Sequence, residues 1–293
     1  MNSIDQLGRS VSLPVWPPRR LVSLVPSQTE LLYDLGLEEE VVGITKFCVH
    51  PAEWFANKPR VGGTKTLNFE KIKKLEPDLI IGNKEENERG QIELLAQQYP
   101  VWMSDVVSLT DAYDMMLRIG ELTGKAPEAA GLVQEIKEQF ALHFPPLAPG
   151  LKPATFNFQP STFNFQPSTF NFQPSTLHPL RVAYFIWRKP YMAAGSGTFI
   201  HEMLQVAGLD NVFGDRPRYP EISPDELAAA RPEVILLSSE PYPFREKHFG
   251  AFREVCPAAR VHLVDGEMFS WYGSRLLKSP QYLSELRKNL HPV

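Results

Sequence analysis

The stretch Lys125 to Phe144, KAPEAAGLVQEIKEQFALHF, decides the fold because it predicts one long helix between two similar halves of the chain. Pro127 suits the first turn, where no backbone N–H is needed, and Pro145 with Pro146 ends the helix because neither can donate a backbone hydrogen bond. Its apolar residues recur every three or four positions and fall along one stripe of the helix. They are Ala129, Val133, Ile136, Phe140 and Phe144. We predict a stiff connector that limits how far one half moves against the other, with an ordinary packing helix as the alternative.

Strands alternate with helices on both sides of this connector. The expected strands are Leu21–Val25, Val41–Ile44, Asp78–Ile81, Val101–Met103, Arg181–Trp187, Val234–Leu237 and Val261–Val264, after a short hairpin over Asp5–Pro14. The expected helices are Ser27–Gly36, Phe69–Leu75, Leu109–Leu122, Thr198–Ala207, Phe249–Val255 and Ser279–Asn289, with one more after Asn83. Ser27 is expected to cap the first of these helices, with Glu30 completing a capping box. This order predicts an α/β protein with mostly parallel sheets, where ligands meet the carboxyl ends of strands.

A local echo indicates that the two halves share one plan. EKIKKLEPDLII at Glu70 to Ile81 and DELAAARPEVIL at Asp225 to Leu236 each have an acidic start, a proline seven positions on, and then an acidic residue before three apolar ones. We therefore expect two Rossmann-like lobes over residues 1–124 and 181–293, joined by the helix at 125–144 and a linker at 145–180.

The linker carries three near-identical copies of STFNFQP between Ala154 and Thr176. Its alternation has the period of a strand, but a proline in every seventh position prevents a long ladder. We expect a tolerated surface insertion, and an adhesive patch is the alternative.

Composition excludes several classes of partner. The 293 residues suffice for two domains, and the net charge of −4 gives no general attraction to nucleic acid or to anionic lipid. No apolar run is long enough to span a membrane, and the first 20 residues show no basic region followed by an apolar one. As written, the chain is expected in the cytoplasm, as a monomer.

No catalytic constellation or nucleotide-binding glycine pattern is present in the sequence. Cys48 and His50 would place two metal-binding side chains near one strand end, but no second pair stands at useful spacing. A buried cysteine beside a loop histidine explains them equally well, so we expect no metal site, no intrinsic cofactor and no enzyme activity.

Aromatic and amphipathic residues cluster after the predicted strands of both halves, where they face the space between the lobes. Aromatic rings with polar tips suit a bulky ligand that has an apolar body and forms hydrogen bonds at its edge. Aromatic residues at the ends of strands can also simply cover the ends of the hydrophobic core. The candidate ligand-binding residues are Phe47, His50, Asn83, Lys84, Glu85, Trp187, Arg188, Tyr219, Trp271, Tyr272 and Arg275.

Several segments together resemble the helical-backbone substrate-binding proteins of ABC importers for cobalamin, haem and ferric siderophores. They include RLVSLVPSQTELLYDLGL, NFEKIKKLEPDLIIG, the connector, GSGTFIHEMLQVAGLDNVF and YPEISPDELAAARPEVILL. The likeness covers nearly the whole chain except the repeat, and it is greatest for the cobalamin-binding members. It implies the class III fold, in which two lobes on a stiff helix hold ligand in a cleft, and a periplasmic location if a leader precedes this sequence.

The resemblance also implies residue roles. Glu70 and Asp225 match the carboxylates that dock on the permease, and Phe47 and Tyr219 match aromatic positions of the cobalamin site. Thr64 and Asn83 replace two tryptophans of that site, so its stacking surface is not reproduced. Trp187, Trp271 and Tyr272 could substitute for it, while Lys84, Arg188 and Arg275 could instead recognise an anionic iron chelate.

We expect a protein that captures a bulky metal-containing or metal-chelating ligand, cobalamin-like or a ferric siderophore, for delivery to an ABC importer. A cytoplasmic carrier or sensor of corrinoid or metal is the first alternative. An enzyme that acts on a bound tetrapyrrole, with His50 or Glu85 as acid or base, is the second.

Overall fold

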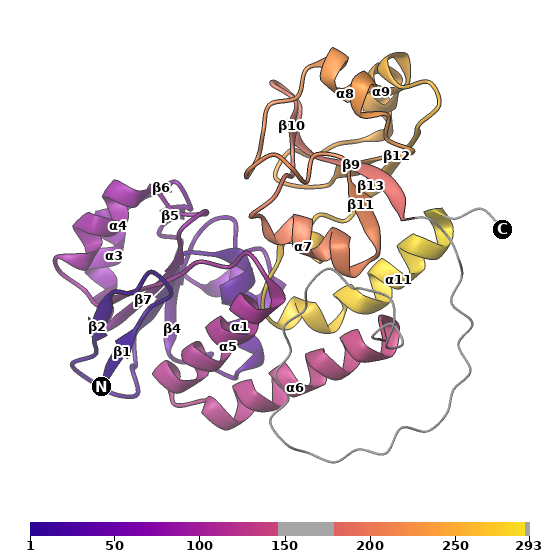
Figure 1. Cartoon of the computed structure of the whole chain (residues 1–293). Helices are drawn as coiled ribbons and strands as arrows, with labels where there is room; N and C mark the ends of the chain where they lie inside the picture. The colour runs from indigo at the N-terminus through magenta and orange to yellow at the C-terminus, as the bar shows by residue number, and fades with distance from the viewer. Residues whose placement is uncertain (146–178, 291–293) are drawn as a thin grey trace, which may run out of the picture.

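The computed structural model describes residues 1–145 and 179–290, and the STFNFQP repeat falls outside the described residues. Two separate parallel sheets form the centres of two lobes (Figure 1). A two-stranded hairpin, β1 (Asn2–Ile4) and β2 (Ser10–Ser12), precedes the first sheet, with Gly8 in its turn at a φ of +78°. The two-lobed α/β class predicted from the sequence is confirmed.

The first lobe is built on a four-stranded parallel sheet in the order β4-β3-β7-β8. Its strands are β3 (Leu21–Ser23), β4 (Val41–Ile44), β7 (Leu79–Asn83) and β8 (Val101–Ser104). Its helices are α1 (Pro26–Asp34), α2 (Ala52–Asn57), α3 (Phe69–Leu75), α4 (Arg89–Ala96) and α5 (Leu109–Thr123), with a small β5–β6 hairpin (Gly62–Gly63 and Thr66–Leu67). Helices cover both faces of this sheet, and alternate strand residues therefore enter two different core clusters.

The second lobe repeats the plan on a sheet centred on β9 and β12. Its strands are β9 (Leu180–Trp187), β10 (Met192–Ala193), β11 (Leu209–Asn211), β12 (Val234–Ser238) and β13 (Arg260–Val264). Only β10 is antiparallel. Its helices are α7 (Phe199–Val206), α8 (Pro224–Ala230), η1 (Glu246–His248), α9 (Phe249–Val255), α10 (Glu267–Ser270), η2 (Ser274–Leu277) and α11 (Ser279–Leu290).

Helix α6 (Ala126–His143) is the predicted connector, and it runs beneath both lobes in Figure 1. It packs on α5 at one end and on α11 and η2 at the other. Ala129, Val133, Ile136 and Phe140 are buried in one continuous core that includes residues of both lobes. Because a packed core resists deformation, this contact limits how far one lobe can move against the other.

The predicted capping box at Ser27 is wrong. Helix α1 begins at Pro26 and its N-cap is Val25, whose side chain makes no capping bond. The carboxylate of Glu30 instead binds Arg275, so it is not available to the start of its own helix.

The sequence echo has a structural counterpart. Helices α3 and α8 are followed by the C-cap residues Glu76 and Arg231, which have φ values of +43° and +47° in the left-handed region. A proline follows each of them, and because proline has no N–H to extend the helix, the chain turns directly into the next strand.

Among the described residues, no helix combines the length and the apolar composition needed to cross a membrane. Within residues 1–145 and 179–290, no group of three or more histidine, cysteine, aspartate or glutamate side chains is placed to hold a metal ion. The Sγ of Cys48 bonds with the hydroxyls of Thr29 and Thr45 in the core, whereas His50 lies beside Glu267.

Candidate functional site at the lobe junction

The central strands of both sheets end in polar residues. Strand β7 ends at Asn83 and leads into Glu85 and Glu86, and β12 ends at Ser238 and leads to Glu240. Loops that follow parallel strands carry the ligand contacts in open α/β folds. These loops therefore provide the polar groups of the candidate site.

Glu85 makes a direct contact between the lobes. Its carboxylate lies 3.2 Å from the Nη1 of Arg218 and accepts a hydrogen bond from the hydroxyl of Tyr219 at 3.4 Å. Burial raises the pKa of Glu85, and Arg218 opposes that rise. Burial and the neighbouring Glu85 also raise the pKa of Tyr219, so its hydroxyl keeps its proton. The sequence prediction that Glu85 and Tyr219 lie together at the junction is thus matched by the structure.

A second contact is centred on Arg275 in η2. Its guanidinium donates to Glu30 of α1 through two nitrogens, at 2.9 and 2.8 Å, and its Nη1 lies 2.9 Å from Glu267. The arginine side chain is 8% exposed, so this pairing takes place largely out of water. Gly273 allows the approach, since a Cβ there would stand 3.1 Å from the backbone oxygen of Ser27 and its φ is +140°.

Trp271 joins these groups into one cluster. The Arg275 guanidinium lies 4.8 Å from its ring centroid, and the His50 ring of the first lobe stands 5.5 Å away at an angle of 70°. His50 Nε2 is also 3.3 Å from Glu267. His50, Trp271 and Arg275 were all predicted as ligand-binding residues, and the structure brings them together.

Glu240 extends the cluster to the end of β12. One of its oxygens accepts hydrogen bonds from the Oγ of Ser270 at 2.7 Å and from the indole Nε1 of Trp271 at 2.9 Å. Burial, together with Glu267 and Glu86, raises its pKa to about 7 against the lowering effect of these two bonds. No cation stands within ion-pair distance of Glu240 among the described residues.

Polar atoms at the same junction are buried without partners. Gln28 is fully buried in the first turns of α1, and Tyr272 and Ser274 are 6% and 4% exposed. Among the residues the structure describes, the Gln28 Oε1, the Tyr272 hydroxyl and the Ser274 Oγ have no hydrogen-bond partner of normal geometry. A buried polar atom without a partner costs free energy, so three of them at one junction indicate a place where further polar contacts are made.

Other predicted residues have partners within their own lobe. Asn83 is buried, where it donates to the Oγ of Ser104 and accepts from the backbone of Glu85. Lys84 pairs with Asp105 at 2.6 Å. Lys84 and Arg275, which the sequence suggested as anion-binding groups, are thus each paired with carboxylates of the chain itself.

The exposed predicted aromatics lie nearer the surface. Phe47 is 50% exposed beside the Lys46 ammonium, and Trp187 is 38% exposed, with its ring 5.7 Å from that of Tyr242. Arg188 follows Trp187 and is partly buried. Thr64, which stands where the resemblance places a tryptophan, is buried and its carbonyl accepts from the Asn87 amide.

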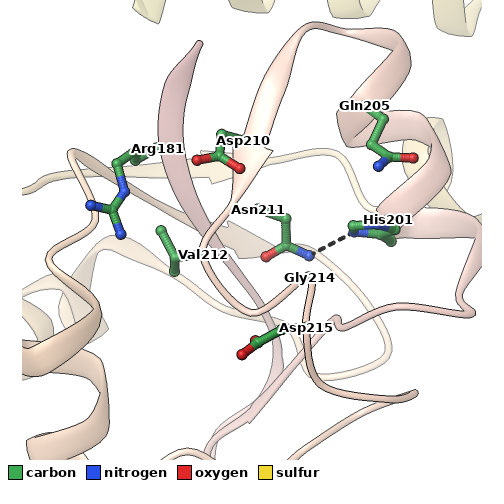
Figure 2. Close-up of a pocket in the computed structure, with 8 residues that line it drawn as sticks. All are labelled: Arg181, His201, Gln205, Asp210, Asn211, Val212, Gly214 and Asp215. Atoms are coloured by element: carbon green, nitrogen blue, oxygen red, sulfur yellow. Dashed lines mark hydrogen bonds between the residues drawn. The ribbon is translucent and has the colours of Figure 1, made fainter. Parts of the chain in front are cut away.

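A shallow depression of about 380 Å³ lies elsewhere on the second lobe (Figure 2). It is lined by Arg181, His201, Gln205, Asp210, Asn211, Val212, Gly214 and Asp215, none of which was predicted to bind ligand. The Asn211 amide lies 3.2 Å from the Nδ1 of His201 across its floor, as Figure 2 shows. This depression has no residue in common with the lobe junction.

Sequence reasoning missed the acidic part of the junction, namely Glu30, Glu86, Glu240 and Glu267. Glu86 and Glu240 follow predicted strands by a few residues, which is the same signal that selected Glu85. The prediction did not include Glu86 and Glu240 because it gave preference to aromatic residues.

Comparison with known proteins shows what this chain is similar to. Residues 21–143 match the sequence profile of the family described as periplasmic binding protein. The vitamin B12-binding protein of Pectobacterium carotovorum is 24% identical over 94% of this chain and 90% of its own length. The uncharacterised ABC transporter substrate-binding lipoprotein YvrC of Bacillus subtilis is 24% identical over 92% of this chain and 79% of its own.

Solved structures show the same fold over nearly the whole chain. The periplasmic vitamin B12-binding protein BtuF of Vibrio cholerae has a TM-score of 0.70 at 20% identity, covering 94% of this chain and 98% of its own. The periplasmic heme-binding protein RhuT of Roseiflexus has a TM-score of 0.72 at 22% identity, covering 93% and 97%. Residues 21–143 are therefore similar to the periplasmic binding protein family, and the chain shares the two-lobed fold of these solved structures over nearly its whole length.

Proposed function

We propose that the chain is a substrate-binding protein that captures a bulky ligand of the corrinoid or haem kind at the lobe junction. The observation that carries the proposal is that two sets of contacts lie at the lobe junction. One is the contact between Glu85 and Tyr219, and the other is the cluster of His50, Trp271 and Glu240. Groups from both lobes and from the carboxyl ends of both central strands converge there.

The relatives support this class of ligand. Proteins of the same fold and of similar length are named for the binding of vitamin B12 and of heme. Both compounds hold a metal in a broad macrocycle, for which we propose the ring of Trp271 as an apolar contact and the hydroxyl of Tyr219 as a polar one. The metal belongs to the ligand, and we propose no cofactor of the protein itself.

Because α6 joins the lobes through a shared core, we propose that the ligand enters a largely preformed site. Affinity then comes from contacts that already exist and from a small adjustment of the lobes, since a stiff connector does not permit wide closure. The chain is proposed to act without catalysis, which agrees with the description of its relatives as binding proteins.

Delivery to an ABC permease is part of the proposal, because one relative is described as the substrate-binding lipoprotein of such a transporter. Glu70 and Asp225 occupy equivalent places in the first turns of α3 and α8, and both are exposed. Two exposed carboxylates, one on each lobe, suit docking to basic residues of a membrane partner.

We propose that the protein works outside the cytoplasmic membrane, as its family is described as periplasmic. Cell fractionation tests this location. Recovery of the native protein only in the cytoplasm would favour the carrier or sensor alternative on the same fold.

Equilibrium binding of cyanocobalamin and haem, measured by calorimetry, tests the ligand class. The proposal expects saturable binding of one molecule per chain for at least one of them. The variant Glu85→Gln should weaken that binding, whereas Glu254→Gln, at an exposed position of α9, should leave it unchanged.

A further inference from the structure

The charges of the lobe junction point to the kind of chemical group that its ligand presents. Five carboxylates gather there, from Glu30, Glu85, Glu86, Glu240 and Glu267. Arg275 serves both Glu30 and Glu267, and Arg218 serves Glu85. The arginines therefore neutralise fewer carboxylates than the site contains.

Of these five carboxylates, Glu240 and Glu86 make no ion pair with the described residues. They come from opposite lobes, at the ends of β12 and β7. Trp271 donates a hydrogen bond to Glu240, and its ring contacts His50 of the first lobe. Tyr219 of the second lobe donates to Glu85, which precedes Glu86 in the sequence. Glu86 also lies close enough to Glu240 to contribute to the rise in its pKa, so these two uncompensated carboxylates, which make no ion pair, belong to the same junction.

The unpartnered polar atoms lie in the same place. The hydroxyl of Tyr272 stands close enough to Glu86 and Glu85 that they add to the effect of burial in raising its pKa. The Gln28 Oε1 can only accept a hydrogen bond, and it has no donor within the described residues. The groups left over at the junction are thus two carboxylates and the Gln28 acceptor, together with the hydroxyls of Tyr272 and Ser274, which can donate as well as accept.

We propose that this site selects a ligand whose periphery presents hydrogen-bond donors, as carboxamide or ammonium groups, and rejects a ligand that presents carboxylates. The proposal rests on the function proposed above and adds to it the chemistry of the ligand edge. A donor placed between Glu86 and Glu240 gives these carboxylates a partner that no cation among the described residues supplies. A carboxylate placed there meets like charges in a poorly solvated site, which disfavours its binding.

The test compares ligands that differ only at the edge. Cobinamide and cobyrinic acid share the corrin ring, but the first carries carboxamides where the second carries carboxylic acids. Haem and its bis-amide form the corresponding porphyrin pair. At pH 8, we expect the amide member of the bound pair to bind at least about tenfold more tightly than the carboxylate member.

Variants at the two uncompensated carboxylates locate the effect. Glu240→Gln and Glu86→Gln should each reduce the preference for the amide member by improving carboxylate binding, while Glu254→Gln should leave the ratio of affinities unchanged. Thermal unfolding of each variant confirms that it is folded before affinities are compared.

The outcomes separate the two proposals. Equal or tighter binding of the carboxylate member overturns the inference and leaves the proposed function standing. Failure of all four compounds to bind the folded protein overturns the proposed function, and this inference with it. Preference for the amide that survives both substitutions also overturns the inference, because the selection would then come from other groups.

Discussion

Arg275 in η2 donates to both oxygens of Glu30 in α1, at 2.9 and 2.8 Å, across 245 positions of sequence. The same guanidinium holds Glu267 at 2.9 Å, so a single buried cation links the start of the first lobe to the end of the second. Burial raises the pKa of Glu30, and the neighbouring Arg275 opposes that rise.

Replacing this arginine should destabilise the protein strongly. Arg275→Met leaves two carboxylates without their cation in a poorly solvated place, and breaking a buried pair in this way costs about 3–5 kcal/mol. Chemical denaturation should show this loss, whereas Arg253→Met, at an exposed site on α9, should cost less than about 0.5 kcal/mol. The double variant Arg275→Met with Glu30→Met should recover part of the loss. Strict additivity of the two single changes would contradict the direct pairing.

The central ring of the candidate site gives a second prediction. Trp271 is 6% exposed and contacts His50, Arg275 and Glu240. Trp271→Ala should therefore weaken ligand binding by more than about tenfold, the scale of a hot-spot loss. Trp271→Phe, which keeps a ring but loses the N–H donor to Glu240, should lose less. Trp16→Ala, at a 53% exposed ring that was assigned no part in binding, serves as the matched control. Unchanged affinity in a folded Trp271→Ala protein would remove this residue from the site.

The pH dependence of stability should report on Glu240. Its pKa in the folded protein is about 7, above the ordinary 4.5, because of burial and the nearby Glu267 and Glu86. Between these values the folded protein binds more protons than the unfolded chain, so stability is highest at the acidic end and falls as pH rises toward 7. This one group accounts for at most about 3 kcal/mol of the fall.

Denaturation midpoints measured from pH 5 to 7 test this sign. Glu240→Gln should flatten the decline, although Glu30, Glu85 and Glu86, whose pKa values burial also raises, retain part of it. Glu226 does not affect this measurement. Hydrogen bonds with Ser223 lower its pKa to about 2, so its contribution to the free energy of unfolding changes only below about pH 4.5. A decline as steep in Glu240→Gln as in the native protein would show that Glu240 does not titrate in this range.

Charge reversal on the outer faces should separate docking from ligand binding. Glu70→Lys and Asp225→Lys alter exposed first-turn positions and should leave ligand affinity within about twofold, since neither residue lies at the junction. Transport by a reconstituted permease should fall for both variants. A large loss of ligand affinity would instead assign these acids to the site.

Local patterns predicted most of the regular structure. Helices Phe69–Leu75 and Phe249–Val255 and strand Val41–Ile44 were predicted to the residue, because capping, apolar spacing and proline boundaries are local properties. Strands β10 and β11 were missed because two or three residues form a strand only through pairing with β9, which is distant in sequence.

The candidate site was only partly predictable for the same reason. The position after a predicted strand marked Glu85 and Trp271, and a long loop marked Tyr219. In the structure Tyr219 contacts Glu85, and Trp271 contacts His50 of the other lobe. The role of Glu30 depends on Arg275 at the far end of the chain, and the absence of a cation beside Glu240 among the described residues depends on the whole arrangement of loops. Such pairings follow from the tertiary fold and leave no local trace in the sequence.

Intrinsic tryptophan fluorescence, titrated with cyanocobalamin, haem and a panel of ferric siderophores, tests the central claim most directly. Trp271 lies within the candidate site, so a bound macrocycle should quench its emission, and Trp271→Phe should lose most of that signal while it still binds by calorimetry. The account predicts saturable quenching by one ligand at micromolar concentration or below. A folded protein that shows no response to any of them, by fluorescence or by calorimetry, would contradict it.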